Sequence, residues 1–99
     1  MARSSSEMIP EDTLEKMVRI FKAIANPVRL QIVNVLLRNE CSVGELVKAL
    51  GANQSLTSQR LSDLKFGGVL KSRRDGNKTY YSLANNSIRK IVESIIAET

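Results

Sequence analysis

The sequence has no histidine, no tryptophan and a single cysteine among its 99 residues. One cysteine cannot form an internal disulfide, so we expect a reducing compartment, the cytoplasm. The sequence also shows no paired carboxylates near a nucleophile and no glycine-rich phosphate loop, so we expect no enzymatic activity. Because thiolate and imidazole ligands are so scarce, we expect neither a metal site nor another cofactor.

Long hydrophobic runs are also missing. Stretches such as Val35 to Leu37 fall far short of the roughly 20 apolar residues that a membrane-spanning helix needs. The first residues lack the apolar segment of a secretory signal. We therefore expect residues 1–10 to be a disordered tail, residues 11–99 to form one domain, and the protein to have no membrane partner.

Acidic residues are few where basic residues are many. The formal net charge is +5, and most of it lies in the second half of the chain. Between Arg60 and Lys90 eight basic residues stand against only Asp63 and Asp75. A basic half beside a nearly neutral half indicates a polyanionic partner, either a nucleic acid or an anionic membrane surface.

The first half of the chain has helical periodicity. Apolar residues from Leu14 to Ala25 predict a helix over residues 11–25, with Asp12 or Thr13 as its N-cap. Asn26 and Pro27 then have the order of an N-cap and a first helical residue. The helix that follows is apolar on more than one side, so we expect it to be central.

Two short helices come next. Ser42 and Glu45 have the spacing of a capping box, and Gly51 stands where a helix ends in a left-handed residue. Asn53 is placed to cap a fourth helix that runs to about Phe66, with the apolar residues Leu56, Leu61 and Leu64 on its buried face. Two short helices joined by a tight turn that contains glycine form a helix-turn-helix unit.

Beyond Gly68 the apolar period becomes that of strands. Residues 69–74 and 79–83 flank an Asp-Gly turn, which predicts a β-hairpin. Asn86 is then expected to cap a final helix. The whole order predicts a mainly α, winged helix-turn-helix domain with the elements α-α-α-α-β-β-α.

The fourth helix has hydrogen-bonding side chains outside its apolar face. Glutamine can pair with adenine, arginine with guanine, and a threonine methyl can contact thymine, so this helix suits the major groove of DNA. The alternative is an ordinary solvated helix face. The predicted base-reading residues are Gln54, Ser55, Thr57, Ser58, Gln59 and Arg60.

The hairpin has four basic residues around its glycine turn. In an alternating strand Lys71 and Arg73 share one face while Arg74 points to the other, so not all can touch DNA together. We therefore predict that the tip residues Arg74, Asn77 and Lys78 contact the sugar-phosphate backbone or the adjacent minor groove. The alternative is a charged edge strand that protects against aggregation.

The first and last helices have apolar stripes that so small a domain cannot obviously cover. We predict that they form a homodimer interface, the alternative being packing within the monomer. A two-fold dimer would present its recognition helices to successive major grooves, roughly 34 Å apart, and so bind an inverted repeat. The predicted interface residues are Leu14, Met17, Phe21, Ile88, Ile91, Val92, Ile95 and Ile96.

Four segments in register resemble the ArsR/SmtB family of metal- and stress-responsive repressors. Residues 21–32, which contain Ala-Asn-Pro-Val-Arg-Leu, are similar to the family's opening block, and residues 41–46 to the start of its third helix. Residues 53–64 are similar to its recognition helix and residues 74–83 to its wing. The resemblance covers roughly residues 14–97 and implies a dimer that blocks transcription until an inducer weakens DNA binding.

The chain departs from this family where inducers bind. Metal sensors of the family use paired cysteines, or Asp, His and Glu ligands on the last helix, whereas this chain has Asn85 and Ser87 there and only Glu98 near its end. Arg60 stands where the family usually has histidine. The resemblance thus leaves the inducer unknown. The missing ligands argue against metal sensing, the alternative being a symmetric site of two cysteines across a dimer.

Cys41 is the remaining chemically distinctive residue. It precedes a helix start, where amide dipoles can lower the pKa of a thiol, although the neighbouring Glu40 opposes this effect. One hypothesis is a thiol sensor of oxidants or electrophiles. The alternative, which the absence of a second cysteine favours, is a small buried apolar residue.

Together these features predict a sequence-specific transcriptional regulator, a repressor that binds an inverted-repeat operator in double-stranded DNA as a homodimer. The alternative from another class is a winged-helix adaptor that binds a protein through its wing or recognition face. The basic bias between Arg60 and Lys90 argues against the adaptor.

Overall fold

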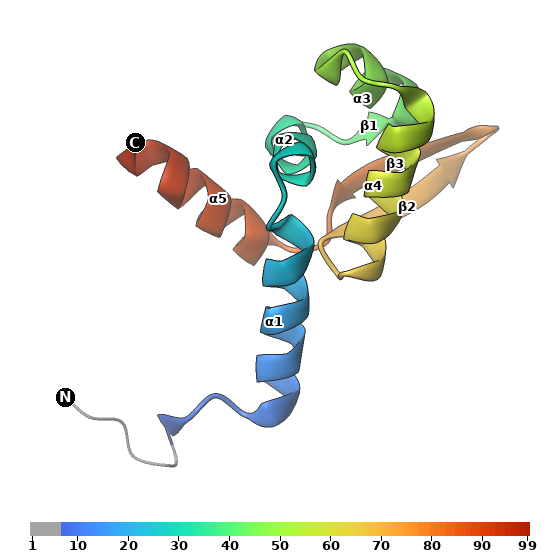
Figure 1. The fold of residues 1–99 in the computed structure, drawn as a ribbon. Helices are drawn as coiled ribbons and strands as arrows, with labels where there is room; N and C mark the ends of the chain where they lie inside the picture. Colours follow the sequence, from blue (N-terminus) through green and yellow to red (C-terminus); the bar gives the residue numbers. More distant parts are fainter. Residues whose placement is uncertain (1–6) are drawn as a thin grey trace.

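The computed structural model describes residues 7–99 as five helices and a small sheet (Figure 1). The helices follow the predicted order, and the winged helix-turn-helix architecture is confirmed. Residues 1–6 of the predicted tail lie outside the described residues, and residues 7–10 are exposed. The elements are α1 (Glu11–Ile24), α2 (Pro27–Leu36), β1 (Cys41–Ser42), α3 (Val43–Leu50), α4 (Gln54–Phe66), β2 (Leu70–Asp75), β3 (Lys78–Leu83) and α5 (Asn86–Glu98).

Side-chain caps begin the central helices, as the sequence predicts. The amide oxygens of Asn26 and Asn53 each accept a hydrogen bond, 3.0 Å long, from the third residue of the following helix. Ser42 and Glu45 form both bonds of the capping box. These bonds satisfy backbone amides that have no partner within the helix.

Two predicted caps are wrong. The residue before α1 is Pro10, which makes no side-chain cap, so neither Asp12 nor Thr13 is the N-cap. The cap of α5 is Asn85 rather than Asn86, because the Asn85 side chain accepts a bond from the amide of Ile88 at 3.2 Å. In both places the helix begins one or more residues earlier than the pattern of apolar residues indicates.

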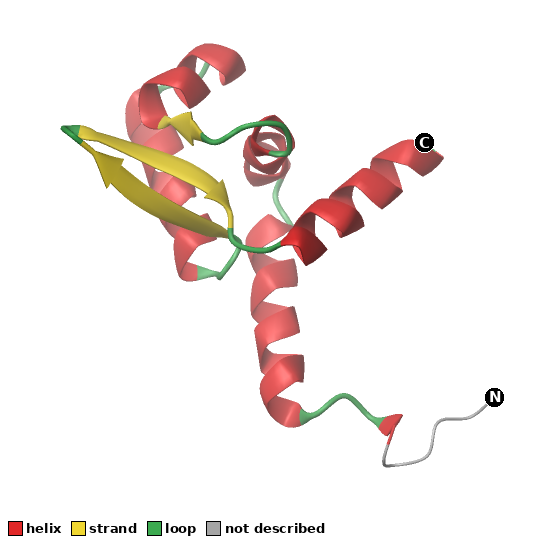
Figure 2. Ribbon diagram, turned by 180° about the vertical axis from the view of Figure 1, so that it is seen from behind, coloured by secondary structure: helices red, strands yellow, loops and turns green. Residues whose placement is uncertain are grey.

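The sheet is antiparallel, with the strand order β1-β3-β2 (Figure 2). The hairpin pairs Leu70 with Leu83 at its base and Asp75 with Lys78 at its tip, where Gly76 takes a φ of 65°. The sequence analysis missed β1, in which Cys41 pairs with Tyr81. A strand of two residues is too short to show an alternating pattern.

The hydrophobic core joins α2, α3, α4, the sheet and the first half of α5. Helix α2 is central, as predicted, since Ile32, Val33 and Leu36 are fully or almost fully buried. By contrast α1 has no buried residue and extends away from the body of the subunit, as does the second half of α5 (Figures 1 and 2). No helix within residues 7–99 combines the length and apolarity needed to cross a membrane.

Helix α1 meets the body of the subunit at Gly67, directly after α4. A Cβ atom on this buried glycine would lie 2.5 Å from the Cβ of Ala23 in α1. No side chain fits there without a shift of one helix against the other. The glycine therefore permits the close approach of α1 to the end of α4.

We expect Gly67→Ala to lower the free energy of unfolding by about 1–3 kcal/mol, because the added methyl group forces α1 and α4 apart. Urea denaturation at a fixed protein concentration measures this change. The matched control is Gly44→Ala in α3, where the nearest atom to a new Cβ is 4.0 Å away. The control should be neutral or stabilising by up to about 1 kcal/mol. Equal stability of the two variants would contradict the close approach.

Candidate nucleic-acid interface

The buried face of α4 fixes how the helix presents its other side chains. Leu61 and Leu64 are fully buried, and Thr57 is 1% exposed. The Thr57 hydroxyl donates a hydrogen bond of 2.8 Å to the carbonyl oxygen of Asn53, so this polar side chain is satisfied inside the protein. The prediction that Thr57 contacts a base is therefore wrong. Leu56, expected on the buried face, is 42% exposed.

The opposite side of α4 is polar and uncharged. The structure brings four of the six predicted base-reading residues together along one shallow depression and adds Ser62, which the sequence analysis missed. Its position four residues after Ser58 places it one turn further along the same face. This outer face of α4 consists of Gln54, Ser55, Ser58, Gln59 and Ser62.

No negative charge lies on the outer face of α4. The one acidic residue of the helix, Asp63, lies 3.5 Å from Arg60 and 3.6 Å from Arg29 of α2. Both arginines therefore neutralise the carboxylate. Arg60 does not line the outer face, and its side chain is 29% exposed. Its contact with a base stays a prediction.

The predicted wing residues Arg74, Asn77 and Lys78 are all exposed on the β2–β3 hairpin. Asn77 and Lys78 line a depression together with residues 42–44, so the hairpin tip and the start of α3 form one continuous surface. Hydrogen bonding from Ser42 lowers the pKa of the Glu45 carboxyl, and the charge of the nearby Lys78 lowers it further, to a smaller extent.

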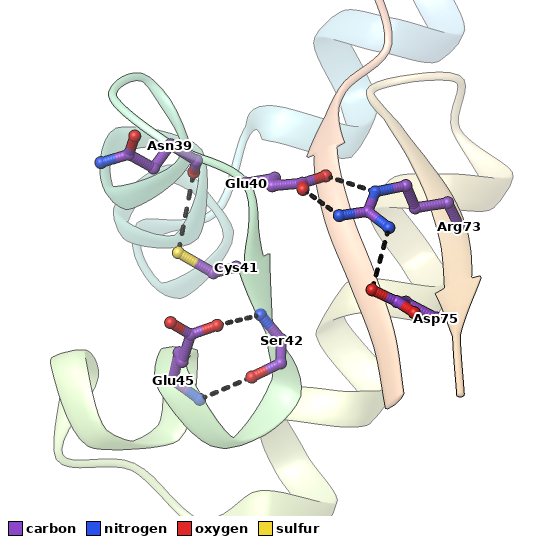
Figure 3. A network of polar contacts seen from close by, with 7 residues as sticks. All are labelled: Asn39, Glu40, Cys41, Ser42, Glu45, Arg73 and Asp75. Atoms are coloured by element: carbon purple, nitrogen blue, oxygen red, sulfur yellow. Dashed lines mark hydrogen bonds and ion pairs between the residues drawn. The ribbon is translucent and has the colours of Figure 1, made fainter. Parts of the chain in front are cut away.

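Arg73 is engaged with its own subunit. Its guanidinium makes a two-pronged contact with the Glu40 carboxylate, in which Nε lies 3.0 Å from Oε2 (Figure 3). The same group lies 4.8 Å from the centre of the Tyr80 ring. The hydrogen bonds from Arg73 lower the pKa of Glu40. This arrangement favours the hairpin tip, rather than Arg73, as the part of the wing that meets DNA.

The apolar stripes of α1 and α5 are only partly exposed to solvent. Leu14, Phe21, Ile91, Ile95 and Ile96 are between 37% and 62% exposed, and Met17 is half-buried. The predicted interface is wrong in two places, because Ile88 and Val92 are 2% and 7% exposed and pack in the core of their own subunit.

A cavity of about 480 Å³ lies between α2 and α5 and is lined in part by Leu30, Ile91, Ile95 and Ile96. The predicted dimer interface did not include Leu30 or Val18, which are 41% and 42% exposed. These two residues extend the uncovered apolar surface beyond the predicted interface.

Comparison with known proteins decides the family. A family model described as bacterial regulatory protein, arsR family, matches residues 26–72. Transcriptional activator HlyU of Vibrio cholerae is 39% identical over 83 residues, which make up 84% of this chain and 77% of HlyU. The transcriptional repressor SmtB homolog of Synechocystis is 33% identical, over 90% of this chain and 67% of that protein. The chain belongs to the ArsR family.

Solved structures of ArsR relatives have the same fold. The homodimeric winged helix-turn-helix DNA-binding domain of Mb0332 from Mycobacterium bovis matches with a TM-score of 0.80 and 32% identity, over 99% of this chain and 91% of that one. HlyU from Vibrio cholerae matches with a TM-score of 0.79 and 37% identity, over 87% of this chain and 94% of HlyU. The resemblance to the ArsR/SmtB family is thereby confirmed.

Within residues 7–99 no three His, Cys, Asp or Glu side chains lie together in a way that could hold a metal ion. Asn85, at the position of a last-helix ligand, uses its side chain to cap α5.

The surroundings of Cys41 stabilise the thiol rather than the thiolate. The residue is half-buried on β1, and Sγ lies 3.6 Å from the carbonyl oxygen of Asn39, to which it donates (Figure 3). Partial burial, followed by the charges of Glu45 and Glu40, raises the pKa of Cys41. The expected lowering by the start of α3 is therefore outweighed, which argues against a reactive thiol sensor.

We expect Cys41 in the folded protein to be alkylated more slowly at pH 7 than an unstructured cysteine, because less of it is thiolate. The pH dependence of iodoacetamide alkylation, followed by mass spectrometry, gives its pKa. The same chain in denaturant is the control and should show the ordinary cysteine pKa. A folded-state pKa at or below that of the denatured chain would contradict this assignment.

Proposed function

We propose that this ArsR protein is a cytoplasmic transcriptional regulator that binds an inverted repeat in double-stranded DNA as a homodimer. The observation that carries the proposal is the outer face of α4. Five hydrogen-bonding, uncharged side chains lie along it, and the only acidic side chain of the helix is paired with two arginines. A surface of this composition can approach phosphates without repulsion and still distinguish bases.

The glutamines of the outer face supply most of the proposed base recognition. Gln54 lies in the first turn of α4, the part of a recognition helix that reaches base edges in known helix-turn-helix complexes. A glutamine amide can bond both N6 and N7 of adenine, whereas serine hydroxyls accept several bases. We therefore expect adenine to be selected opposite Gln54 or Gln59.

The wing supplies contacts that do not depend on sequence. Arg74 and Lys78 are exposed beside the hairpin turn, and Asn77 can donate to a phosphate oxygen. Such contacts release counterions from DNA, so affinity should fall steeply with salt. They would set the position of α4 in the groove rather than its preference for a base.

The proposed dimer would bring two copies of α4 to one duplex. The uncovered apolar residues of α1 and α5, Leu14, Phe21, Ile91, Ile95 and Ile96, support self-association, as does the homodimeric structure of the relative Mb0332. Two-fold symmetry makes the two sites an inverted repeat, with recognition helices roughly 34 Å apart.

We further propose repression as the outcome, because a dimer on promoter DNA excludes other proteins from it. The relatives include one named as an activator and one named as a repressor. Displacement of another DNA-binding protein by the same dimer would give activation. The position of the operator therefore decides whether binding lowers or raises transcription.

We expect Gln54→Ala to weaken binding to the preferred duplex by about 1–3 kcal/mol and to relax the base preference at one position of each half-site. Binding to a random duplex should hardly change. Selection of duplexes from a random pool, followed by titration, measures both effects. Equal losses on the two duplexes would make Gln54 a phosphate contact.

The matched control is Thr57→Ala, at a buried position of the same helix. It removes an internal hydrogen bond and should lower the free energy of unfolding without changing which base is preferred. A change of base preference in this variant would return Thr57 to the DNA-contacting set.

We expect Lys78→Ala to weaken binding to specific and random duplexes alike and to reduce the slope of log affinity against log salt by about 1. Fluorescence anisotropy over a range of salt concentrations measures this slope. An affinity that hardly depends on salt in the unaltered protein would instead favour the protein-binding adaptor.

A further inference from the structure

Three helices meet at the guanidinium of Arg29. Its Nε donates a hydrogen bond of 2.5 Å to the carbonyl oxygen of Ala23, in the last turn of α1. Its Nη1 lies 3.6 Å from Oδ2 of Asp63, in the last turn of α4. Arg29 itself lies in the first turn of α2. One side chain of α2 therefore joins the end of α1 to the end of α4.

The contact with Ala23 satisfies a group that would otherwise lack a partner. The last carbonyls of a helix have no amide within the helix to bond to, and Ala23 supplies one of these to Arg29. The side chain of Arg29 is only 19% exposed, so water competes weakly for its guanidinium, whereas Asp63 is 37% exposed and its ion pair is partly screened. The hydrogen bond from the planar guanidinium to Ala23 is directional, and the ion pair with Asp63 holds the same group beside α4, so the two contacts together restrict the angle between the helices.

Arg60 cannot replace Arg29 in this role. Arg60 also lies 3.5 Å from Asp63, but both residues belong to α4. An ion pair within one helix cannot fix the position of a second helix. The buried Nε of Arg60 has no hydrogen-bond partner. Arg29 alone, among these three charged residues, spans α1, α2 and α4.

At the same place the chain directly after α4 approaches α1 closely. Gly67 follows α4 directly and lies against Ala23, the residue whose carbonyl Arg29 holds. Arg29 and Gly67 thus both contact Ala23, Arg29 at its carbonyl oxygen and Gly67 at its side chain. The half-buried Ile20, Ala23 and Ile24 of α1 pack against the core at this joint, whereas the first two turns of α1 hold no residue of the core cluster.

We propose that Arg29 is a positioning residue that fixes the angle between α1 and α4 and, in the dimer, the separation of the two recognition helices. This rests on the proposed function, in which α1 belongs to the dimer interface and α4 enters DNA. Because the interface lies on one side of the joint and the DNA on the other, a looser joint lets the two α4 helices vary in spacing. Two-site binding weakens when the sites cannot be engaged together.

The angle itself can be measured without DNA. Spin labels at Lys16→Cys in α1 and Ser62→Cys in α4, in a Cys41→Ser background and diluted with unlabelled protein, report their distance within one subunit. We expect a narrow distance distribution in the parent protein and a broad one in Arg29→Met, which removes every donor but keeps the apolar stem. A distribution that stays narrow would overturn the proposal.

The consequence for DNA is tested on inverted repeats recovered by selection, with the spacer between half-sites lengthened or shortened by single base pairs. We expect Arg29→Met to lose about tenfold in affinity for the best spacer and to discriminate less between spacers. Affinity for a single half-site should fall much less, because Arg60 still neutralises Asp63. An equal loss on the half-site would show that Arg29 acts on α4 alone and would overturn the proposal.

Two further variants make the result decisive. Arg38→Met removes an exposed arginine beyond α2 and should match the parent protein in both measurements. Asp63→Asn weakens the bridge while leaving the Arg29–Ala23 bond, so it serves if Arg29→Met does not fold, and it should shift both measurements in the same direction. A parent protein that prefers no duplex would refute the proposed function, while the spin-label distances would still decide whether Arg29 sets the angle.

Discussion

The burial of one face of α4 is the constraint on which the rest of the structure depends. Leu61 and Leu64 are fully buried against α2, α3 and the sheet, and Thr57 joins them because its hydroxyl bonds the carbonyl one turn earlier. A helix held along one side in this way cannot rotate, so its opposite side is presented at a fixed angle. The glutamines and serines of that side are thereby available for hydrogen bonds to a duplex. The ion pairs of Asp63 with two arginines neutralise the one negative charge of α4, which would otherwise repel the phosphates of the duplex.

The centre of the subunit is a buried core, while its two arms, α1 and the second half of α5, are partly exposed. The core fixes α2, α3, α4 and the wing relative to one another, while α1 and the second half of α5 keep apolar side chains uncovered. This division suits a protein in which the centre binds DNA and the arms bind a second copy. The junction of Gly67, Ala23 and Arg29 connects the two parts. Cys41 and its acidic neighbours lie elsewhere and show no sign of thiol activation.

Much of this could be predicted from the sequence, because it depends on local interactions. The caps at Asn26, Ser42 and Asn53 and the left-handed Gly51 need only residues within one turn of each other. The predictions that were wrong concern features that depend on tertiary contacts. The side of α4 that faces the core decides whether Thr57 or Leu56 is buried, and hydrophobicity alone favours the wrong one. Ile88 and Val92 cannot be distinguished from Ile91 and Ile95 by residue type, because only the position of α5 against the core separates them. The Arg29–Asp63 pair joins residues far apart in the sequence, so no local sequence pattern predicts it.

The central claim is that two copies of α4, each held by its buried face, enter successive major grooves of one duplex. Protection of guanine N7 from dimethyl sulfate, together with a hydroxyl-radical footprint on the selected duplex, tests it most directly. The result we expect is two symmetric patches of major-groove protection, centred roughly one helical turn apart, with backbone protection at their outer flanks where the wings lie. A single protected patch, or protection confined to the minor groove, would contradict it.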